Sequence, residues 1–173
     1  MKLKISQEEY DNLESKTILE FALKQSQEVL HQMVMEWNWD DSDSFLNWLV
    51  DSPLTDKSTV LMIYWKSAPR YFKQYQNREE VLLKESHSID NYDLIEKLER
   101  NYQNGFYKKS NFEFDPKAEL WTEEYLNIKT VKEIPEIMFN KTNGIRIENP
   151  TNFTEGCPPE LDKLLEELYH KYH

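Results

Sequence analysis

The chain has 173 residues, of which 39% are hydrophobic, 13% aromatic and 31% charged, a composition that excludes a disordered chain and predicts one folded domain over residues 1–173. Its 21 Lys and Arg against 32 Asp and Glu give a formal net charge of −11. This charge repels phosphate backbones and anionic lipids, so it argues against nucleic acid and membrane partners and favours a basic protein.

The first hundred residues contain no glycine, which favours helices over tightly turned sheets. Ser6 is placed to cap a short helix through Glu14. A longer helix is predicted from about Thr17 to Trp37, because Leu19, Leu23, Leu30 and Met33 mark an approximate inward stripe.

Two helical segments are predicted next. Asp40 or Asp41 is a candidate cap for a helix that ends near Asp51, before Pro53. Asp56 is a candidate cap for a fourth segment with the apolar run 60–65, which periodicity alone leaves open between a buried helix and a buried strand.

Further helices are expected at 78–84, after Asn77 as a cap, and from Ser88 to a stop at Asn104-Gly105. Asp115-Pro116 predicts the start of another helix, with Trp121, Tyr125 and Ile128 along one side.

The last part of the chain is predicted to contain a small hairpin and a final helix. Asn143-Gly144 lies between the apolar triplets 137–139 and 145–147, a pattern typical of a type I′ turn. Pro158-Pro159 leads into the clearest amphipathic pattern of the chain. The predicted fold class is therefore mainly α, a compact multi-helix bundle with at most a short β-hairpin.

The segment around residues 37–78 concentrates charge and aromatic side chains. Residues 36–56 contain six acids and no Lys or Arg, and residues 57–78 contain five basic residues and no acid. The segment supplies nine of the chain's 23 aromatic residues. One interpretation is two packed helices with an aromatic core; the other is a surface that recognises a partner, since Trp, Tyr and Arg are enriched at interface hot spots. The candidate partner-binding residues are Trp39, Asp40, Asp41, Asp43, Tyr64, Arg70 and Tyr71.

The stretches 37–41, 45–49, 61–65 and 69–71 read WNWDD, FLNWL, LMIYW and PRY. With this pattern, residues from about 30 to 80 resemble the uncharacterised bacterial family catalogued as domain of unknown function 4274. The family pattern has a glycine after the paired aspartates, where this chain has Ser42. The resemblance implies no reaction. Small acidic domains of this kind are often encoded beside secreted bacterial toxins and act as their immunity partners.

No catalytic motif emerges from the sequence, and we expect no catalytic residue, cofactor or metal. The chain has no His-Glu-x-x-His arrangement and no phosphate-binding glycine loop. Asp40, Asp41 and Asp43 could offer oxygens to Mg²⁺ or Ca²⁺, but the loop lacks the EF-hand pattern and helix capping explains the acids equally well.

The expected location is the cytoplasm. Cys157 is the chain's one cysteine, which fits a reducing compartment, and the N-terminus turns polar before an apolar region of signal-peptide length. The longest apolar run, 60–65, has six residues, against about 20 for a membrane-spanning helix.

Three functional hypotheses follow. The leading one is a non-catalytic protein-binding protein, namely an immunity protein that neutralises a cognate toxin. The second is a small ligand-binding domain or enzyme that uses Asp40, Asp41 and Arg70 around a pocket lined by Trp39 and Tyr64. The third is a structural adaptor whose C-terminal helix, 159–170, pairs with another subunit; the oligomeric state is left open.

Overall fold

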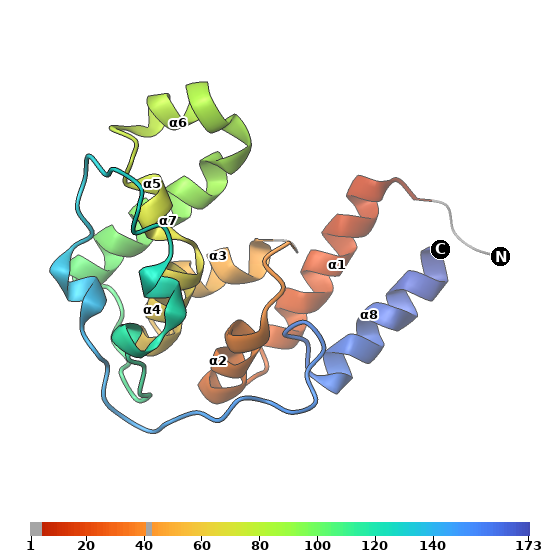
Figure 1. The fold of residues 1–173 in the computed structure, drawn as a ribbon. Helices are drawn as coiled ribbons and strands as arrows, with labels where there is room; N and C mark the ends of the chain where they lie inside the picture. Colours follow the sequence, from red (N-terminus) through yellow and green to blue (C-terminus); the bar gives the residue numbers. More distant parts are fainter. Residues whose placement is uncertain (1–4, 41–42) are drawn as a thin grey trace. The chain divides into compact units, whose positions relative to one another are not determined.

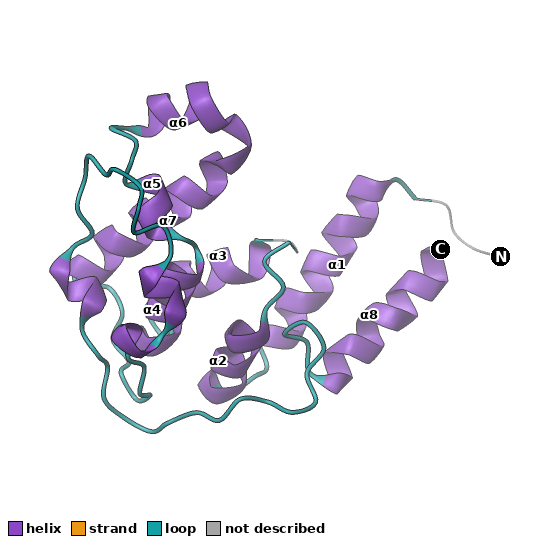
Figure 2. Ribbon diagram, in the orientation of Figure 1, coloured by secondary structure: helices purple, strands orange, loops and turns teal. Residues whose placement is uncertain are grey.

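The computed structural model describes residues 5–40 and 43–173, and the chain divides into two compact units. Unit 1 comprises residues 1–49 and 147–173, and unit 2 comprises residues 50–146. Helices make up almost all regular structure of the described residues, which confirms the mainly α class (Figures 1 and 2). In those residues no helix is both long and apolar enough to cross a bilayer. A single domain over the whole chain stays a prediction.

The first two helices of unit 1 each begin at a serine cap. Before α1 (Gln7–Ala22), the Ser6 hydroxyl accepts a hydrogen bond from the Glu9 N–H at 3.2 Å, and the Glu9 carboxylate accepts one from the Ser6 N–H at 2.8 Å. Before α2 (Gln27–Glu36), the Ser26 hydroxyl accepts from the Val29 N–H at 3.3 Å. Side-chain oxygens at this position satisfy amide groups that have no partner within the helix.

The predicted division of this region into helices 6–14 and 17–37 is wrong. α1 continues to Ala22, and a turn at 23–26 separates it from α2. The physical reason lies at Leu23 and Ser26: Leu23 is 66% exposed and so does not extend an inward stripe, whereas the Ser26 side chain starts a new helix.

The helix α3 (Ser44–Asp51) begins directly after Asp43, whose carbonyl accepts a hydrogen bond from the Asn47 N–H at 2.8 Å. Of the two predicted caps, Asp40 lies in the preceding turn and Asp41 lies outside the described residues. The helix ends at Asp51, as predicted.

The predicted C-terminal helix is present as α8 (Pro159–Tyr172), and it runs beside α1 within unit 1 (Figure 1). Leu161 is fully buried, and the Tyr10 ring meets the His173 ring edge to face at 4.7 Å. Leu164 and Tyr169 are exposed. α8 therefore completes the unit that the N-terminal segment begins.

The interior of unit 2 is built around α4 (Lys57–Lys66), in which every residue from Ser58 to Trp65 is buried. The run 60–65 is therefore a buried helix and not a buried strand. A helix whose side chains are apolar on all sides is expected in a protein interior. Asp56 is the predicted cap: its carboxylate accepts from the Ser58 N–H at 3.0 Å and from the Asn111 N–H at 2.6 Å.

The remaining helices of unit 2 are α5 (Pro69–Phe72), α6 (Arg78–Glu85), the 3₁₀ turn η1 (Ser86–Ser88) and α7 (Ile89–Gln103). Asn77 caps α6 as predicted, since its side chain accepts from the Glu80 N–H at 3.0 Å. α7 ends before Gly105, whose φ of +65° is the left-handed conformation expected after a helix. α6 and α7 pack against each other, and α4 packs on α7.

The helix predicted to start at Asp115-Pro116 is wrong. Asp115 does accept a hydrogen bond from the Lys117 N–H at 3.0 Å, but the chain forms only the short 3₁₀ turns η2 (Pro116–Ala118) and η3 (Leu120–Glu123). Tyr125 has a φ of +59° and is 42% exposed. A short helix without a buried face gains too little from packing to offset its nucleation cost.

The predicted hairpin is also wrong. Residues 136–139 form the 3₁₀ turn η4 (Glu136–Phe139), where the Met138 carbonyl accepts a hydrogen bond from the Trp65 indole N–H at 2.8 Å. Residues 142–145 pair instead with 111–114 through isolated bridges. Buried backbone groups need hydrogen-bond partners, and tertiary packing determines which partners are near. The carbonyl of Met138 already accepts from Trp65, so it is not available for a hairpin.

Two buried tyrosines should make unit 2 sensitive to alkaline pH. Burial raises the pKa of Tyr102 and that of Tyr107 to about 12 each. An unfolded tyrosine loses its proton near pH ~10, so the native state binds more protons between about pH 10 and pH 12, and stability falls as the pH rises through this window. Urea unfolding midpoints at a series of alkaline pH values should fall less steeply for Tyr102→Phe. An identical slope in Tyr102→Phe and wild type would contradict this origin, and Tyr169→Phe, at an exposed site, is the control.

Candidate functional site

The unit 1 members of the predicted partner-binding set lie at the turn between α2 and α3. Asp40 and Asp43 are exposed and Trp39 is half-buried; Asp41 lies outside the described residues. The turn is held by Asn38, whose side-chain oxygen accepts from the Asp40 N–H at 3.1 Å. The Asn38 N–H in turn donates to the Glu155 carbonyl at 3.4 Å.

The unit 2 members have different surroundings. Tyr64 is fully buried on α4, so it belongs to the interior of the unit. Arg70 and Tyr71 are half-buried on α5: Arg70 donates to the Thr122 carbonyl at 2.9 Å, and Tyr71 donates to Glu85. Since the predicted set is divided between the two units, its grouping into one binding surface stays a prediction.

Net charge is distributed very unevenly between the units. Unit 1 contains 16 acidic and 6 basic residues, a formal charge of −10, and unit 2 contains 16 acidic and 15 basic residues, a formal charge of −1, which together make the −11 of the chain. Every Asp and Glu of unit 1 that the structure describes is exposed, except the half-buried Glu14. The acidity of this protein is thus a surface property of unit 1.

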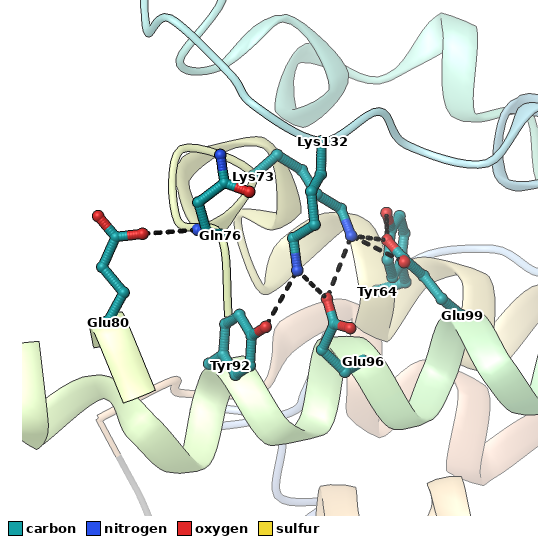
Figure 3. Close-up of polar contacts among 8 residues, drawn as sticks. All are labelled: Tyr64, Lys73, Gln76, Glu80, Tyr92, Glu96, Glu99 and Lys132. Carbon is teal, nitrogen blue, oxygen red and sulfur yellow. Dashed lines mark hydrogen bonds and ion pairs between the residues drawn. The ribbon is translucent and has the colours of Figure 1, made fainter. Parts of the chain in front are cut away.

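Unit 2 also contains a network of buried and half-buried ion pairs, which we call the Lys73 cluster (Figure 3). It consists of Tyr64, Lys73, Tyr92, Glu96, Glu99 and Lys132. The Lys73 side chain is 3% exposed, and its ammonium group lies 2.7 Å from the Glu99 carboxylate and 3.3 Å from that of Glu96. Tyr64 donates to Glu99 at 2.6 Å. Burial, reinforced by the charge of Glu99, raises the pKa of Tyr64, which keeps its hydroxyl a donor.

Lys132 reaches the same cluster from the loop that follows η3, as Figure 3 shows. Its ammonium group lies 3.0 Å from the Tyr92 hydroxyl and 3.3 Å from the Glu96 carboxylate. Burial acts to lower the pKa of Lys132, but the hydrogen bond to Tyr92 and the charge of Glu96 together raise it. The loop backbone is fixed as well, because the Lys73 carbonyl accepts from the N–H groups of Val131 and Lys132 at 2.9 and 3.2 Å.

A cleft of about 230 Å³ opens beside the Lys73 cluster within unit 2. Its lining combines cationic, acidic, polar and apolar side chains: Arg70, Lys73, Thr130, Lys132, Glu133, Ile134 and Phe139. A second cleft, of about 490 Å³, lies in unit 1 between Phe21, Val29 and Phe153. Within residues 5–40 and 43–173, no three His, Cys, Asp or Glu side chains are arranged to hold a metal ion.

Reasoning from the sequence selected Arg70 and Tyr64 but missed the other members of the Lys73 cluster. One usable signal was present: Glu99 lies four residues after Ile95 and next to Leu98, within the buried face of α7. A carboxylate on such a face requires a buried partner. No comparable signal marks Lys132, because it lies 36 residues beyond Glu96 in a segment without helical periodicity.

Comparison with known families tests the resemblance drawn from the aromatic and acidic pattern. Residues 25–103 match the family described as domain of unknown function (DUF4274). The resemblance to DUF4274 is confirmed. The DUF4274-like segment runs from the turn before α2 to the end of α7 and contains all the predicted partner-binding residues together with Lys73, Glu96 and Glu99. No curated protein and no solved structure matches the chain.

Proposed function

We propose that this chain is a non-catalytic, cytoplasmic bacterial protein that binds a basic partner protein, and that the partner is a cognate toxin which it neutralises. The observation that carries the proposal is the formal charge of −10 on unit 1, displayed on exposed carboxylates. The toxin as the kind of partner rests on analogy with small acidic domains that are encoded beside secreted bacterial toxins, because the family that residues 25–103 match has no known function.

The negative charge of unit 1 would act mainly on the rate of association with a partner. Exposed charges of one sign raise the rate at which an oppositely charged protein arrives, and they discourage partners of the same sign. Affinity then depends on a few anchoring side chains. Trp39 fits this role, because it is a half-buried aromatic residue directly beside the exposed Asp40.

The ligand-binding alternative draws on a separate observation. The cleft of unit 2 includes Arg70, as that hypothesis requires, but its lining includes neither Tyr64 nor Trp39. The cleft therefore does not support a pocket formed by Arg70 together with Trp39 and Tyr64, although Arg70 does line a cleft. The adaptor alternative stays a prediction.

Charge reversal at the turn between α2 and α3 tests the proposal. If an adjacent gene encodes a basic protein, that protein is the partner to test, and the variant with Asp40→Lys, Asp41→Lys and Asp43→Lys should bind it with an association rate lowered about tenfold or more at low salt. Stopped-flow association measured at two salt concentrations provides the rate and its salt dependence. In co-expression, this variant should protect cells from that neighbouring protein less well than wild type does.

The matched control reverses three exposed acids of unit 2, at Glu79, Glu123 and Glu136. The total charge changes equally in both variants, so only the position of the charge differs. Equal losses in the two variants would show that net charge alone is used, and full protection by the unit 1 variant would discredit the acidic turn as the contact.

A further inference from the structure

The cleft is lined by three cations, Arg70, Lys73 and Lys132, whereas the adjoining Lys73 cluster contains two carboxylates, Glu96 and Glu99. Lys73 and Lys132 share Glu96, and Lys73 is also paired with Glu99. Arg70, the third cation of the cleft, donates to the neutral Thr122 carbonyl. Its Nε is buried and, in the described part of the chain, has no hydrogen-bond partner. Glu133 also lines the cleft, but it is exposed and so is screened by solvent.

We infer that this cleft binds a small organic carboxylate through Arg70, with Lys73 and Lys132 providing the surrounding positive field. A guanidinium group presents parallel N–H donors whose spacing matches the two oxygens of a carboxylate. One such anion would supply the negative charge that Arg70 lacks. Buried charges and donors are costly when they are left without partners.

The volume and the apolar lining of the cleft limit what can be attached to the carboxylate group of the ligand. Its volume of about 230 Å³ is smaller than that of sites for drug-sized molecules, which begin near ~300 Å³. Ile134 and Phe139 give the cleft an apolar wall, and the Phe139 ring is held against Trp65 with ring centroids 4.9 Å apart. The ligand is therefore a carboxylate with a short aliphatic chain or a single ring.

The cleft is also built in advance of binding. Residues 131 and 132 are hydrogen-bonded to the Lys73 carbonyl, and Lys132 is held by Tyr92 and Glu96. A site whose walls are already ordered loses little conformational entropy when a ligand enters. This inference does not depend on the proposed partner, because it concerns unit 2 by itself.

Titration of the full chain with benzoate and with butyrate, followed by NMR, tests the inference. Each carboxylate should cause saturable shifts of the Arg70 Nε–H signal and of the backbone amides at 130–134. Arg70→Gln should weaken binding by about tenfold or more, since a hydrogen bond to a charged group is lost. Arg100→Gln, at an exposed position on α7, should leave it unchanged.

A second variant keeps the inference testable if Arg70→Gln does not fold. Thr130 is an exposed residue on the rim of the cleft, so Thr130→Phe should fill the cleft and abolish binding while circular dichroism stays native. Non-saturable shifts, equal binding by Arg70→Gln and wild type, or binding of inorganic phosphate without either carboxylate would each overturn the assignment.

Discussion

Replacing Lys73 by methionine should lower the free energy of unfolding by about 3–5 kcal/mol, because the buried carboxylate of Glu99 would lose its charged partner. The Lys73 side chain is 3% exposed and that of Glu99 is 10% exposed, so water cannot take over the role of the ammonium group. Methionine preserves most of the side-chain volume, and the loss therefore reports on charge. Urea unfolding followed by circular dichroism measures the effect.

Two further variants separate buried charge from charge in general. Lys97→Met removes an ion pair whose Asp51 partner is 59% exposed, and it should cost less than about 1 kcal/mol. The double variant Lys73→Met with Glu99→Gln should be more stable than Lys73→Met alone, since no unpaired buried charge is left. Equal costs for Lys73→Met and Lys97→Met would refute the role assigned to the Lys73 cluster.

Gly144→Ala should lower the free energy of unfolding by on the order of 3 kcal/mol, through steric overlap together with backbone strain. A Cβ atom at residue 144 would lie 2.1 Å from the carbonyl oxygen of Asn111 and 2.8 Å from the nitrogen of Phe112. These backbone atoms cannot move freely, because the Ile145 N–H donates to that same carbonyl at 2.9 Å. The φ of +153° adds strain for any residue with a side chain.

Gly105→Ala is the matched comparison for Gly144→Ala. Residue 105 also has a positive φ, of +65°, but a Cβ atom there would meet nothing within 4 Å. Its cost should be about 1 kcal/mol, the ordinary penalty of the left-handed conformation. If thermal or urea unfolding gave the same loss for both variants, the contact with Asn111 would have no energetic role.

The features that the sequence predicted well are those decided within a few residues. Ser6, Asp56 and Asn77 cap helices as expected, since a side-chain oxygen and the amide it accepts from lie two or three residues apart. The helix expected after Asp115 shows the limit of this reasoning. Its cap forms, but whether a helix continues depends on burial of one face, which distant residues decide.

The hairpin shows the same limit for strand pairing. Asn143-Gly144 suits a hairpin locally, yet residues 142–145 pair with 111–114, about thirty residues earlier in the chain. The aromatic segment is a related case: six of its nine aromatic residues are buried, which confirms a core role for those six. Residue type alone does not separate a core aromatic from an interface aromatic.

The candidate sites were predictable to different degrees. The acidic turn at Asp40 and Asp43 follows from composition and position, because exposed acids cluster between two predicted helices. The Lys73 cluster depends on contacts between α4, α5, α7 and the loop at 132, which no periodicity encodes. Arg70 was selected from the sequence for a pocket with Tyr64, but it lines a cleft with Lys73 and Lys132.

The discontinuity of unit 1 has a consequence for the order of events during synthesis. Unit 1 needs residues 1–49 and residues 147–173, because α8 packs on α1. Residues 50–146 leave the ribosome before α8 does, so unit 2 can fold while unit 1 still lacks a helix, and domains generally fold as units during translation. The nearly neutral unit 2 can therefore fold first, and the acidic surface of unit 1 is completed only after α8 has been synthesised.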